Sequence, residues 1–317
     1  MREIEIGKNN SGQRLDKFLQ KYLREASKSF LYKMLRKKNI ILNGKKAVGN
    51  EILTPKDRIT IYFSEETLEK FRGSSNALSY PVTELSIVYE DDDVALLLKP
   101  AGMLSQKAKN SDTTLVEYFL GYLQKTGQWQ PGGAFTPGIC NRLDRNTSGL
   151  VVAGKSLAGL QKMSELLKER AIDKYYLTIV EGVMLEPAVV RGYLSKDGNS
   201  NRVTIFDTEA PGRSYIETAY EPLQNNGTYT LLRVKLVTGK THQIRSHLSA
   251  IGHPLYCDVK YGGKKQEGQT SFFLHAGEIC FPEMDEPFIG LSGKTFTAPL
   301  PARFEKIKEK LFLNFGG

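Results

Sequence analysis

Two helical stripes of apolar residues open the chain. The first consists of Leu15, Phe18, Leu19, Tyr22 and Leu23, and the second of Phe30, Leu31, Met34 and Leu35. Ser27 or Ser29 is placed to cap the second helix. Asn43-Gly44 supplies the two positive-φ residues of a tight turn, so residues 40–46 predict a hairpin. Residues 58–63 predict the strand that closes this small unit.

Beyond residue 84 the pattern consists mainly of consecutive hairpins. Helices are expected at 111–126 and from Ser156 to about residue 170. Strands are expected at 85–89, 94–98, 150–154, 172–182, 190–194, 202–206, 215–220 and 228–237. Strands that follow one another through short turns pair antiparallel. The pattern therefore favours an α+β fold with a mixed, mainly antiparallel sheet over a doubly wound parallel sheet.

A polar segment separates the two patterns. Residues 64–84 contain Gly73 and several serines, and they are interpreted as a linker. The predicted organisation is a small unit at 1–63, a linker at 64–84 and a larger domain at 85–317.

The net charge of +9 is concentrated in the small unit. Residues 1–63 hold 15 Lys or Arg and 6 Asp or Glu, whereas the rest of the chain holds 29 of each kind. A strongly basic module beside a neutral body is typical of nucleic-acid binding. An ordinary solvated basic face is one alternative. A membrane-surface module is another; it would need an amphipathic helix with a bulky apolar face, and the rest of this segment argues against it.

The remaining composition predicts a globular, cytoplasmic protein, and we expect a monomer. Hydrophobic residues make up 40% of the chain and charged residues 25%. Neither a signal peptide nor an apolar run long enough to cross a membrane is evident. Cys140, Cys257 and Cys280 are odd in number and widely spaced, which fits reduced thiols better than disulfides or a metal site.

Residues 139–154 are the first segment that suggests chemistry. Asp144 lies between Arg142 and Arg145, and the polar turn 146–149 and an apolar run follow it. This turn places the carboxylate at the end of a buried strand, facing a cleft. Arginines on both sides favour the anion that a carboxylate nucleophile needs. A structural Asp–Arg pair in a loop explains the same residues.

Two later segments add candidates. In the strand at 172–182, the side chains of Lys174 and Tyr176 share one face. A structural tyrosine with a hydrogen-bonded hydroxyl is the alternative there. Residues 238–248 read Thr-Gly-Lys-Thr-His-Gln-Ile-Arg-Ser-His-Leu. A phosphate-binding loop would need glycine where Val234 stands, so a nucleotide hydrolase is rejected.

The histidines of this region do not predict a metal site. His242, His247 and His253 are separated by five and six residues, unlike the i, i+4 pair of a zinc-binding helix.

Together these segments resemble the RluA family of RNA pseudouridine synthases. Residues 142–149 match its Arg-Leu-Asp…Thr-Ser-Gly motif, with Asn141 in place of the usual His. Residues 174–176 match its Lys-x-Tyr strand, and residues 238–248 match its Thr-Gly-Arg-Thr-His-Gln-Ile-Arg motif, with Lys240 in place of the first Arg. Shorter matches lie at 99–102, at 273–276 and at 252–258, where Cys257 replaces a glycine. The resemblance spans roughly residues 85–285.

The resemblance implies the pseudouridine synthase fold, a curved sheet with flanking helices, and it implies roles for individual residues. Asp144 is the expected catalytic group, and Arg245 its partner through a bidentate contact. Tyr176 is expected to pack on the base and to take the proton from the ring carbon. Arg142 is expected to fill the space that a flipped uridine vacates. Further substrate contacts are expected from Asn141, Lys174, His242 and Gln243.

The basic unit resembles the α-L RNA-binding domain, named after a small-subunit ribosomal protein. In that family the second helix and the hairpin meet the RNA backbone. The residues at these places are Lys28, Lys33, Arg36, Lys37, Lys38 and Lys45.

The implied activity is isomerisation of specific uridines to pseudouridine, first of all in large-subunit ribosomal RNA, with no nucleotide, metal or other cofactor. A synthase acting on transfer RNA is one alternative, and a non-catalytic RNA-binding or ribosome-assembly factor on the same fold is another. A glycoside hydrolase would need a second catalytic carboxylate, which no motif supplies.

Overall fold

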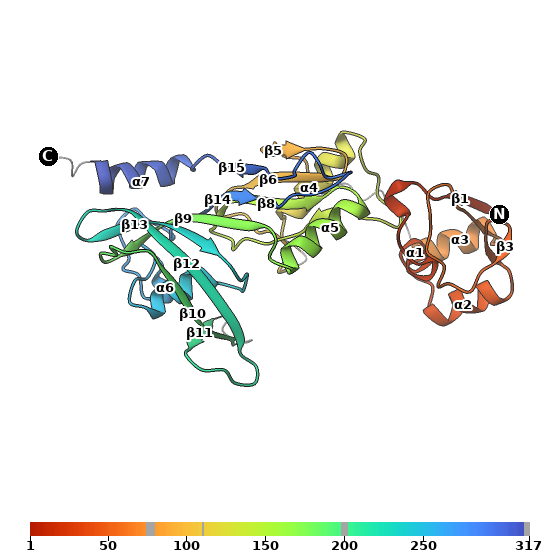
Figure 1. The fold of residues 1–317 in the computed structure, drawn as a ribbon. Coiled ribbons are helices and arrows are strands. Elements are labelled where there is room, and N and C mark those ends of the chain that lie inside the picture. The colour runs from red at the N-terminus through yellow and green to blue at the C-terminus, as the bar shows by residue number, and fades with distance from the viewer. Residues whose placement is uncertain (74–79, 110, 198–201, 314–317) are drawn as a thin grey trace.

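The computed structural model describes residues 1–73, 80–109, 111–197 and 202–313. The chain forms a small N-terminal unit and a larger body, which are separate lobes in Figure 1. Each has its own sheet and its own apolar core. Within the described residues, no helix combines the length and the apolar composition that crossing a membrane requires.

The N-terminal unit follows the predicted pattern closely. Its helices are α1 (Leu15–Tyr22) and α2 (Lys28–Arg36), and its sheet has the order β1 (Arg2–Glu5), β4 (Arg58–Ile61), β2 (Ile40–Leu42), β3 (Lys45–Lys46). The Ser27 hydroxyl caps α2 by accepting from the N–H of Phe30. Asn43 and Gly44 have φ values of 51° and 72°, as a two-residue turn of this kind requires.

The predicted linker is wrong for its first part. Residues 65–72 form helix α3 (Glu65–Arg72), capped by Ser64, and Leu68 is buried in the N-terminal core. The segment was interpreted as a linker because it is polar. One buried leucine and one half-buried phenylalanine, Phe71, nevertheless suffice to hold a two-turn helix. Residues 74–79, the middle of the predicted linker, lie outside the described residues.

An 11-stranded sheet forms the body. Its main path runs β11 (Val203–Phe206), β10 (Ala188–Lys196), β12 (Ser214–Asn225), β13 (Tyr229–Leu236), β9 (Asp173–Glu181), β14 (Leu274–Cys280), β8 (Ser148–Gly154), β6 (Val94–Lys99), β5 (Ile87–Glu90). The strands β15 (Thr295–Thr297) and β7 (Gly138–Ile139) pair with β14 and β8. Among the pairs of named strands in the described residues, only β8–β14 is parallel. The predicted mixed, mainly antiparallel α+β fold is confirmed. The predicted turn at 195–199 lies partly outside the described residues.

Helices cover both faces of the sheet where β6 and β8 run side by side. Ala95, Leu97 and Val151 pack toward α4 (Leu115–Lys125), whereas Leu96 and Val152 pack toward α5 (Leu157–Lys168). Successive residues of a strand point to opposite faces, so a strand with two covered faces must be apolar throughout. This explains the continuous apolar run after the Asp144 turn, and Figure 1 shows the two helices beside these strands.

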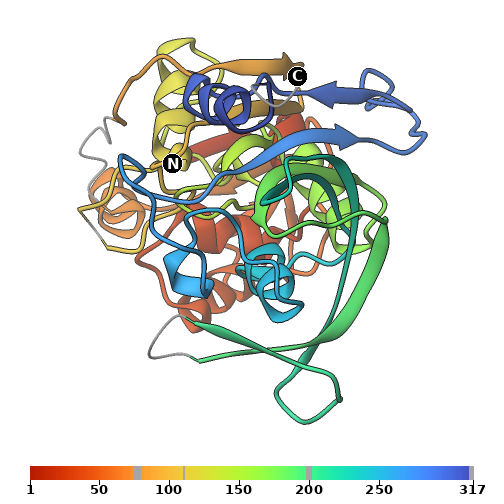
Figure 2. The same ribbon diagram turned by 90° about the vertical axis from the view of Figure 1, so that its left-hand side faces the viewer.

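Two further helices complete the body. Helix α6 (Gln243–Ala250) begins within the second motif. Helix α7 (Ala302–Phe312) lies against the sheet in Figures 1 and 2, and its Phe304, Ile307 and Phe312 pack with Ile179 and Phe273. Helix α7 was not predicted from the sequence.

Gly149 of the Thr-Ser-Gly turn is required by close packing. Its φ is +116°, and an added Cβ would lie 2.2 Å from the carbonyl oxygen of Ala276 on β14. We expect Gly149→Ala to lower the free energy of unfolding by about 2–3 kcal/mol in urea denaturation. Gly138→Ala is the control, since no heavy atom lies within 4 Å of its Cβ position. Equal unfolding midpoints for the two variants would contradict this account.

Candidate active site

Asp144 lies in the loop between β7 and β8, and this loop is fixed by its neighbours. The Ser105 hydroxyl donates to the carbonyl of Leu143 (2.8 Å) and accepts from its N–H (3.1 Å). The N–H of Gly102 donates to the carbonyl of Arg145 (2.8 Å). The backbone is therefore held on either side of Asp144.

Lys99 provides a second anchor for the same loop. Its side chain is fully buried, and its ammonium group donates to three backbone carbonyls, those of Pro100 (3.1 Å), Met103 (2.8 Å) and Arg145 (3.1 Å). Burial lowers the pKa of Lys99 to about 8, against the opposing pull of the Asp144 charge. The lysine thus joins two loops beneath Asp144.

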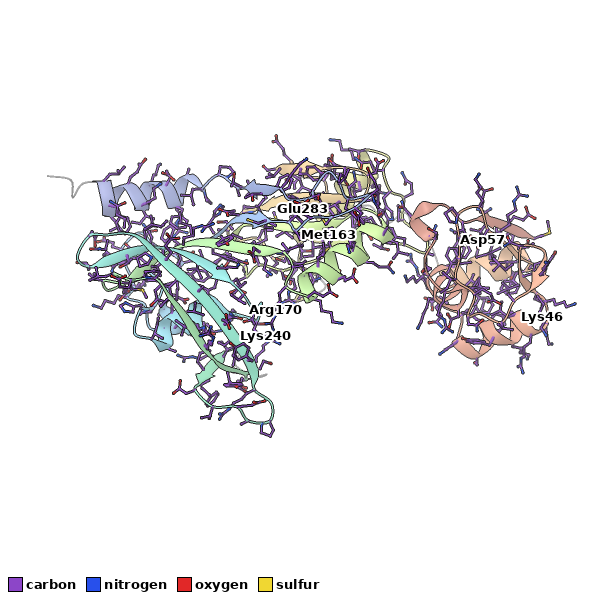
Figure 3. The ribbon with its side chains drawn as sticks, viewed as in Figure 1. Lys46, Asp57, Met163, Arg170, Lys240 and Glu283 are labelled. Atoms are coloured by element: carbon purple, nitrogen blue, oxygen red, sulfur yellow. The ribbon has the colours of Figure 1, made fainter. Side chains whose placement is uncertain are left out.

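A cleft of about 990 Å³ opens beside this loop. It lies where β9, the end of β13 and the start of α6 face the 104–108 loop and the end of α5. Arg170 and Lys240 line it, and both lie at this junction in Figure 3. Asp144, Tyr176 and Arg245 line the same cleft. The structure therefore brings together three side chains that the sequence places 32 and 69 residues apart.

Arg245 contacts Asp144, but not in the predicted way. Its Nη1 lies 3.3 Å from Asp144 Oδ2, whereas its Nε and Nη2 bind both oxygens of Asp258 at 2.6 and 2.9 Å. The predicted bidentate contact with Asp144 is wrong, because Asp258 occupies that face of the guanidinium. Both members of the Arg245–Asp258 pair are buried, with 7% and 2% of their side chains exposed.

Arg245 remains charged in this setting. Burial favours loss of its proton, but hydrogen bonds and charge from Asp258, then the charge of Asp144, raise its pKa above the ordinary value. The guanidinium also stacks on Phe272, 4.1 Å from the ring centroid. Arg245 therefore orients Asp144, and Asp258 in turn orients Arg245.

Tyr176 is buried at the base of the cleft. Burial, followed by the negative charge of Asp144, raises the pKa of its hydroxyl well above the usual range. Within the described part of the chain, the hydroxyl makes no hydrogen bond to protein. The described residues thus offer no partner of the kind that the alternative of a structural, hydrogen-bonded tyrosine needs, and the role of Tyr176 stays a prediction.

The other predicted substrate contacts differ in their surroundings. Arg142 is exposed, and it makes no hydrogen bond or ion pair with the described residues. Lys174 lines the cleft, and burial lowers its pKa. Gln243 is only 2% exposed, and its amide bonds Thr238, Lys240, Thr218 and Glu217. We correct its assignment from substrate contact to holding the 238–243 loop.

The three substitutions within the motifs are accommodated locally. Asn141 accepts from the N–H of Val152 (2.8 Å), which ties the Asp144 loop to β8. Lys240 lines the cleft as a cation in place of the family's arginine. Cys257 has a φ of 64°, the left-handed conformation that glycine adopts most readily.

Basic residues gather in the cleft, although the body as a whole is neutral. Asp144 is the sole acidic residue among the described lining. Nine Lys or Arg residues line the cleft with it: Lys107, Arg142, Arg145, Lys168, Arg170, Lys174, Lys196, Lys240 and Arg245. Counting charge along the sequence missed this, because acidic residues elsewhere in the body cancel the sum. The cleft has the charge expected of a site for a polyanion.

The predicted basic contacts of the N-terminal unit are all on its surface. Lys28, Lys33, Arg36, Lys37, Lys38 and Lys45 are exposed. They lie along α2, just after it and on β3, in the lobe where Figure 3 labels Lys46. Within the described residues, no three His, Cys, Asp or Glu side chains are grouped so that they would hold a metal ion.

Comparison with known proteins places the chain in a family. Residues 93–250 match the family profile of RNA pseudouridylate synthase. A Bacillus subtilis protein named uncharacterized RNA pseudouridine synthase YlyB is 30% identical, with 98% of each chain covered. The chain belongs to the RNA pseudouridine synthase family. It is therefore an isomerase that converts uridine to pseudouridine in RNA.

Two more matches are consistent with this assignment. Ribosomal large subunit pseudouridine synthase C of Vibrio vulnificus is 28% identical, with 97% of this chain and 96% of that protein covered. The solved structure of human RNA pseudouridylate synthase domain containing 4 has the same fold, with a TM-score of 0.59. It is 19% identical, and 71% of this chain and 92% of the human chain are covered. The resemblance seen in the sequence is confirmed.

Four residues of the candidate site were not predicted from the sequence. Asp258, Lys99, Tyr261 and Phe272 surround the predicted residues but received no role. Two of them lay in matched segments, at 99–102 and 252–258. An Asp and a Lys inside otherwise apolar motifs were a usable signal, because charged residues are rarely buried without a partner.

The pKa of Lys99 gives a pH-dependent prediction for the synthase. We expect the isomerisation rate to fall as the pH rises through about 8, because deprotonation removes one N–H donor from the three carbonyls. Folding lowers this pKa from 10.5, so the unfolded chain binds the proton more tightly. Losing the proton therefore raises the free energy of unfolding between about pH 8 and 10.5.

The isomerisation rate is thus expected to fall over the pH range in which deprotonation of Lys99 raises the free energy of unfolding. The measurement is a pH–rate profile with a urea midpoint at each pH. Lys99→Met is the control, since it has no proton to lose. An unchanged alkaline limb in this variant would assign the limb to another group.

Proposed function

We propose that this synthase modifies uridines in large-subunit ribosomal RNA, with Asp144 as the reacting carboxylate and without a cofactor. One observation carries the proposal: Asp144 is the sole carboxylate among the described lining of a strongly basic cleft, and the buried Arg245 holds it there. A polyanionic substrate fits such a cleft, and a carboxylate at its centre is available for chemistry at a sugar carbon.

The reaction requires only bond exchange and proton movement. The bond from N1 of uracil to C1′ of ribose breaks, the base turns, and C5 bonds to C1′. A proton leaves C5, and one arrives at N1. Asp144 acts either by bonding to C1′ or by stabilising the positive charge that develops on the sugar. Arg245 favours the ionised carboxylate in both cases.

For Tyr176 we propose packing against the base rather than removal of the C5 proton. Its raised pKa keeps the hydroxyl protonated near neutral pH, and a neutral phenol is a weak base. The ring lies within the apolar core, where it forms a firm surface for a flipped uracil.

The target uridine must leave the RNA stack to reach this site, at a cost of a few kcal/mol. Arg142 is our candidate for the space that the uridine vacates, because it is exposed at the cleft and makes no hydrogen bond or ion pair with the described residues. Its guanidinium plane suits stacking between bases.

The choice of RNA rests on the relatives and on the charge of the N-terminal unit. Several relatives bear the name ribosomal large subunit pseudouridine synthase C. We propose that residues 1–63 form an RNA-binding domain, in which the six basic residues of α2 and the β2–β3 hairpin contact phosphates and supply salt-dependent affinity. We also propose residues 85–317 as the catalytic domain.

Pseudouridine mapping in ribosomal and transfer RNA tests the proposal. Cells with the gene intact, deleted, and restored with wild type or Asp144→Asn are compared. Sites in large-subunit RNA that vanish on deletion and return only with Asp144 are expected. Sites confined to transfer RNA would overturn the substrate assignment. Sites that return with Asp144→Asn would overturn the role of the carboxylate.

A further inference from the structure

The two oxygens of Asp144 have different surroundings. Arg245 Nη1 lies 3.3 Å from Oδ2, and His242 Nε2 lies 3.8 Å from the same atom. Oδ1 has no hydrogen bond from the described part of the protein. The carboxylate is therefore held through one oxygen, and the other is open for reaction.

His242 is held in place from its other side. Its Nδ1 lies 2.8 Å from the hydroxyl oxygen of Tyr261, and that oxygen also accepts from the N–H of Val203 at 3.3 Å. The side chain is 9% exposed. The backbone of His242 has a φ of 54°, in the left-handed region that few residues other than glycine adopt.

The surroundings of the Tyr261 hydroxyl favour one tautomer of His242. A tyrosine hydroxyl has one hydrogen and two lone pairs. One lone pair of Tyr261 is used by Val203, and within the described residues His242 is the group placed to receive its hydrogen. Nδ1 is then the acceptor, so the proton of the neutral ring is on Nε2, directed at Asp144.

The charges around His242 agree with a neutral ring at pH 7. Burial lowers the pKa of His242 most, Asp144 raises it, and Arg245 lowers it. From the segment that follows α6, Lys260 lowers this pKa and Asp258 raises it.

We propose that His242, as the neutral Nε2–H tautomer set by Tyr261, is a positioning residue that fixes Oδ2 of Asp144 together with Arg245 and leaves Oδ1 to meet the ribose. The inference rests on the proposed role of Asp144. The present distance of 3.8 Å is longer than a hydrogen bond, so this role requires the two groups to move closer when the substrate fills the cleft.

Nitrogen NMR of the full-length protein labelled with ¹⁵N-histidine tests the tautomer without using activity. The His242 signals are assigned by their loss in His242→Asn. A neutral Nε2–H ring is expected at pH 7, and Tyr261→Phe is expected to shift the signals toward a mixture of tautomers. An Nδ1–H ring or an imidazolium at pH 7 would overturn the proposal.

The reaction rate of the His242→Asn variant distinguishes a positioning role of His242 from a purely structural role. Asparagine tolerates a left-handed backbone and caps helices well, so the unfolding midpoint is expected to persist. We expect the single-turnover rate of tritium release from C5-tritiated large-subunit RNA to fall about 10- to 100-fold, as on losing a hydrogen bond to a charged group. RNA affinity is expected to stay the same.

Two further variants complete the test. His253→Asn is the matched control, because His253 does not line the cleft and bonds the carbonyl of Glu181 instead. A wild-type rate in His242→Asn would reduce His242 to a helix cap and overturn the inference alone. A wild-type rate in Asp144→Asn would instead overturn the proposed function.

Discussion

Asp144→Asn is expected to lower the single-turnover rate of isomerisation by about 10³-fold or more, while RNA binding and folding persist. Asparagine has nearly the shape of aspartate, but it carries no charge with which to bond to C1′ or to stabilise a sugar cation. The fold should tolerate the change, because Arg245 keeps its bidentate partner Asp258. Tritium release from C5, RNA affinity and the urea midpoint are measured on the same preparation.

A matched control for this prediction is Asp92→Asn, an exposed aspartate in the turn before β6. It also loses one negative charge, so it reports the effect of charge on RNA binding alone. Wild-type turnover in both variants would remove Asp144 from the chemistry.

Asp258→Ala is expected to lower the free energy of unfolding by about 3–5 kcal/mol, and to lower the rate as well. The substitution leaves the guanidinium of Arg245 buried without its bidentate partner. Breaking a buried pair by removing one member costs most, because the other charge stays desolvated. The released arginine also no longer orients Asp144. Urea denaturation and the single-turnover rate are the measurements.

Asp173→Ala provides the comparison for that stability effect. Asp173 pairs with Lys235 at 2.6 Å, the same distance as Asp258 Oδ2 to Arg245, but 40% and 35% of the two side chains are exposed. A pair so exposed contributes about 1 kcal/mol or less. If both variants lose equal stability, burial is not what gives the Arg245–Asp258 pair its strength.

The sequence allowed the fold class and a set of candidate site residues to be predicted, because those signals are local. The alternation of residues gave the strands, and Asn43-Gly44 gave the hairpin turn. Three motifs identified Asp144, Tyr176 and Arg245, which the structure brings into one cleft. Their catalytic roles stay predictions until the variants are measured.

What the sequence did not reveal depends on packing between distant segments. Arg245 was paired with the wrong aspartate, since a motif names a partner but does not show which face of the guanidinium is already occupied. Helix α3 was taken as linker because one buried side chain, Leu68, holds it. The basic cleft was hidden because charge was counted along the chain rather than over a surface.

Because basic residues are concentrated in the cleft, the cleft and the rest of the body differ in net charge. The cleft holds nine of the 27 basic and one of the 26 acidic residues of 73–317, which leaves 18 basic and 25 acidic residues over the remainder of the body. The outer surface of the body is then repelled by RNA while the cleft attracts it. The body has a preferred orientation as it approaches RNA, and unproductive encounters on its outer surface are discouraged without any contact to a base.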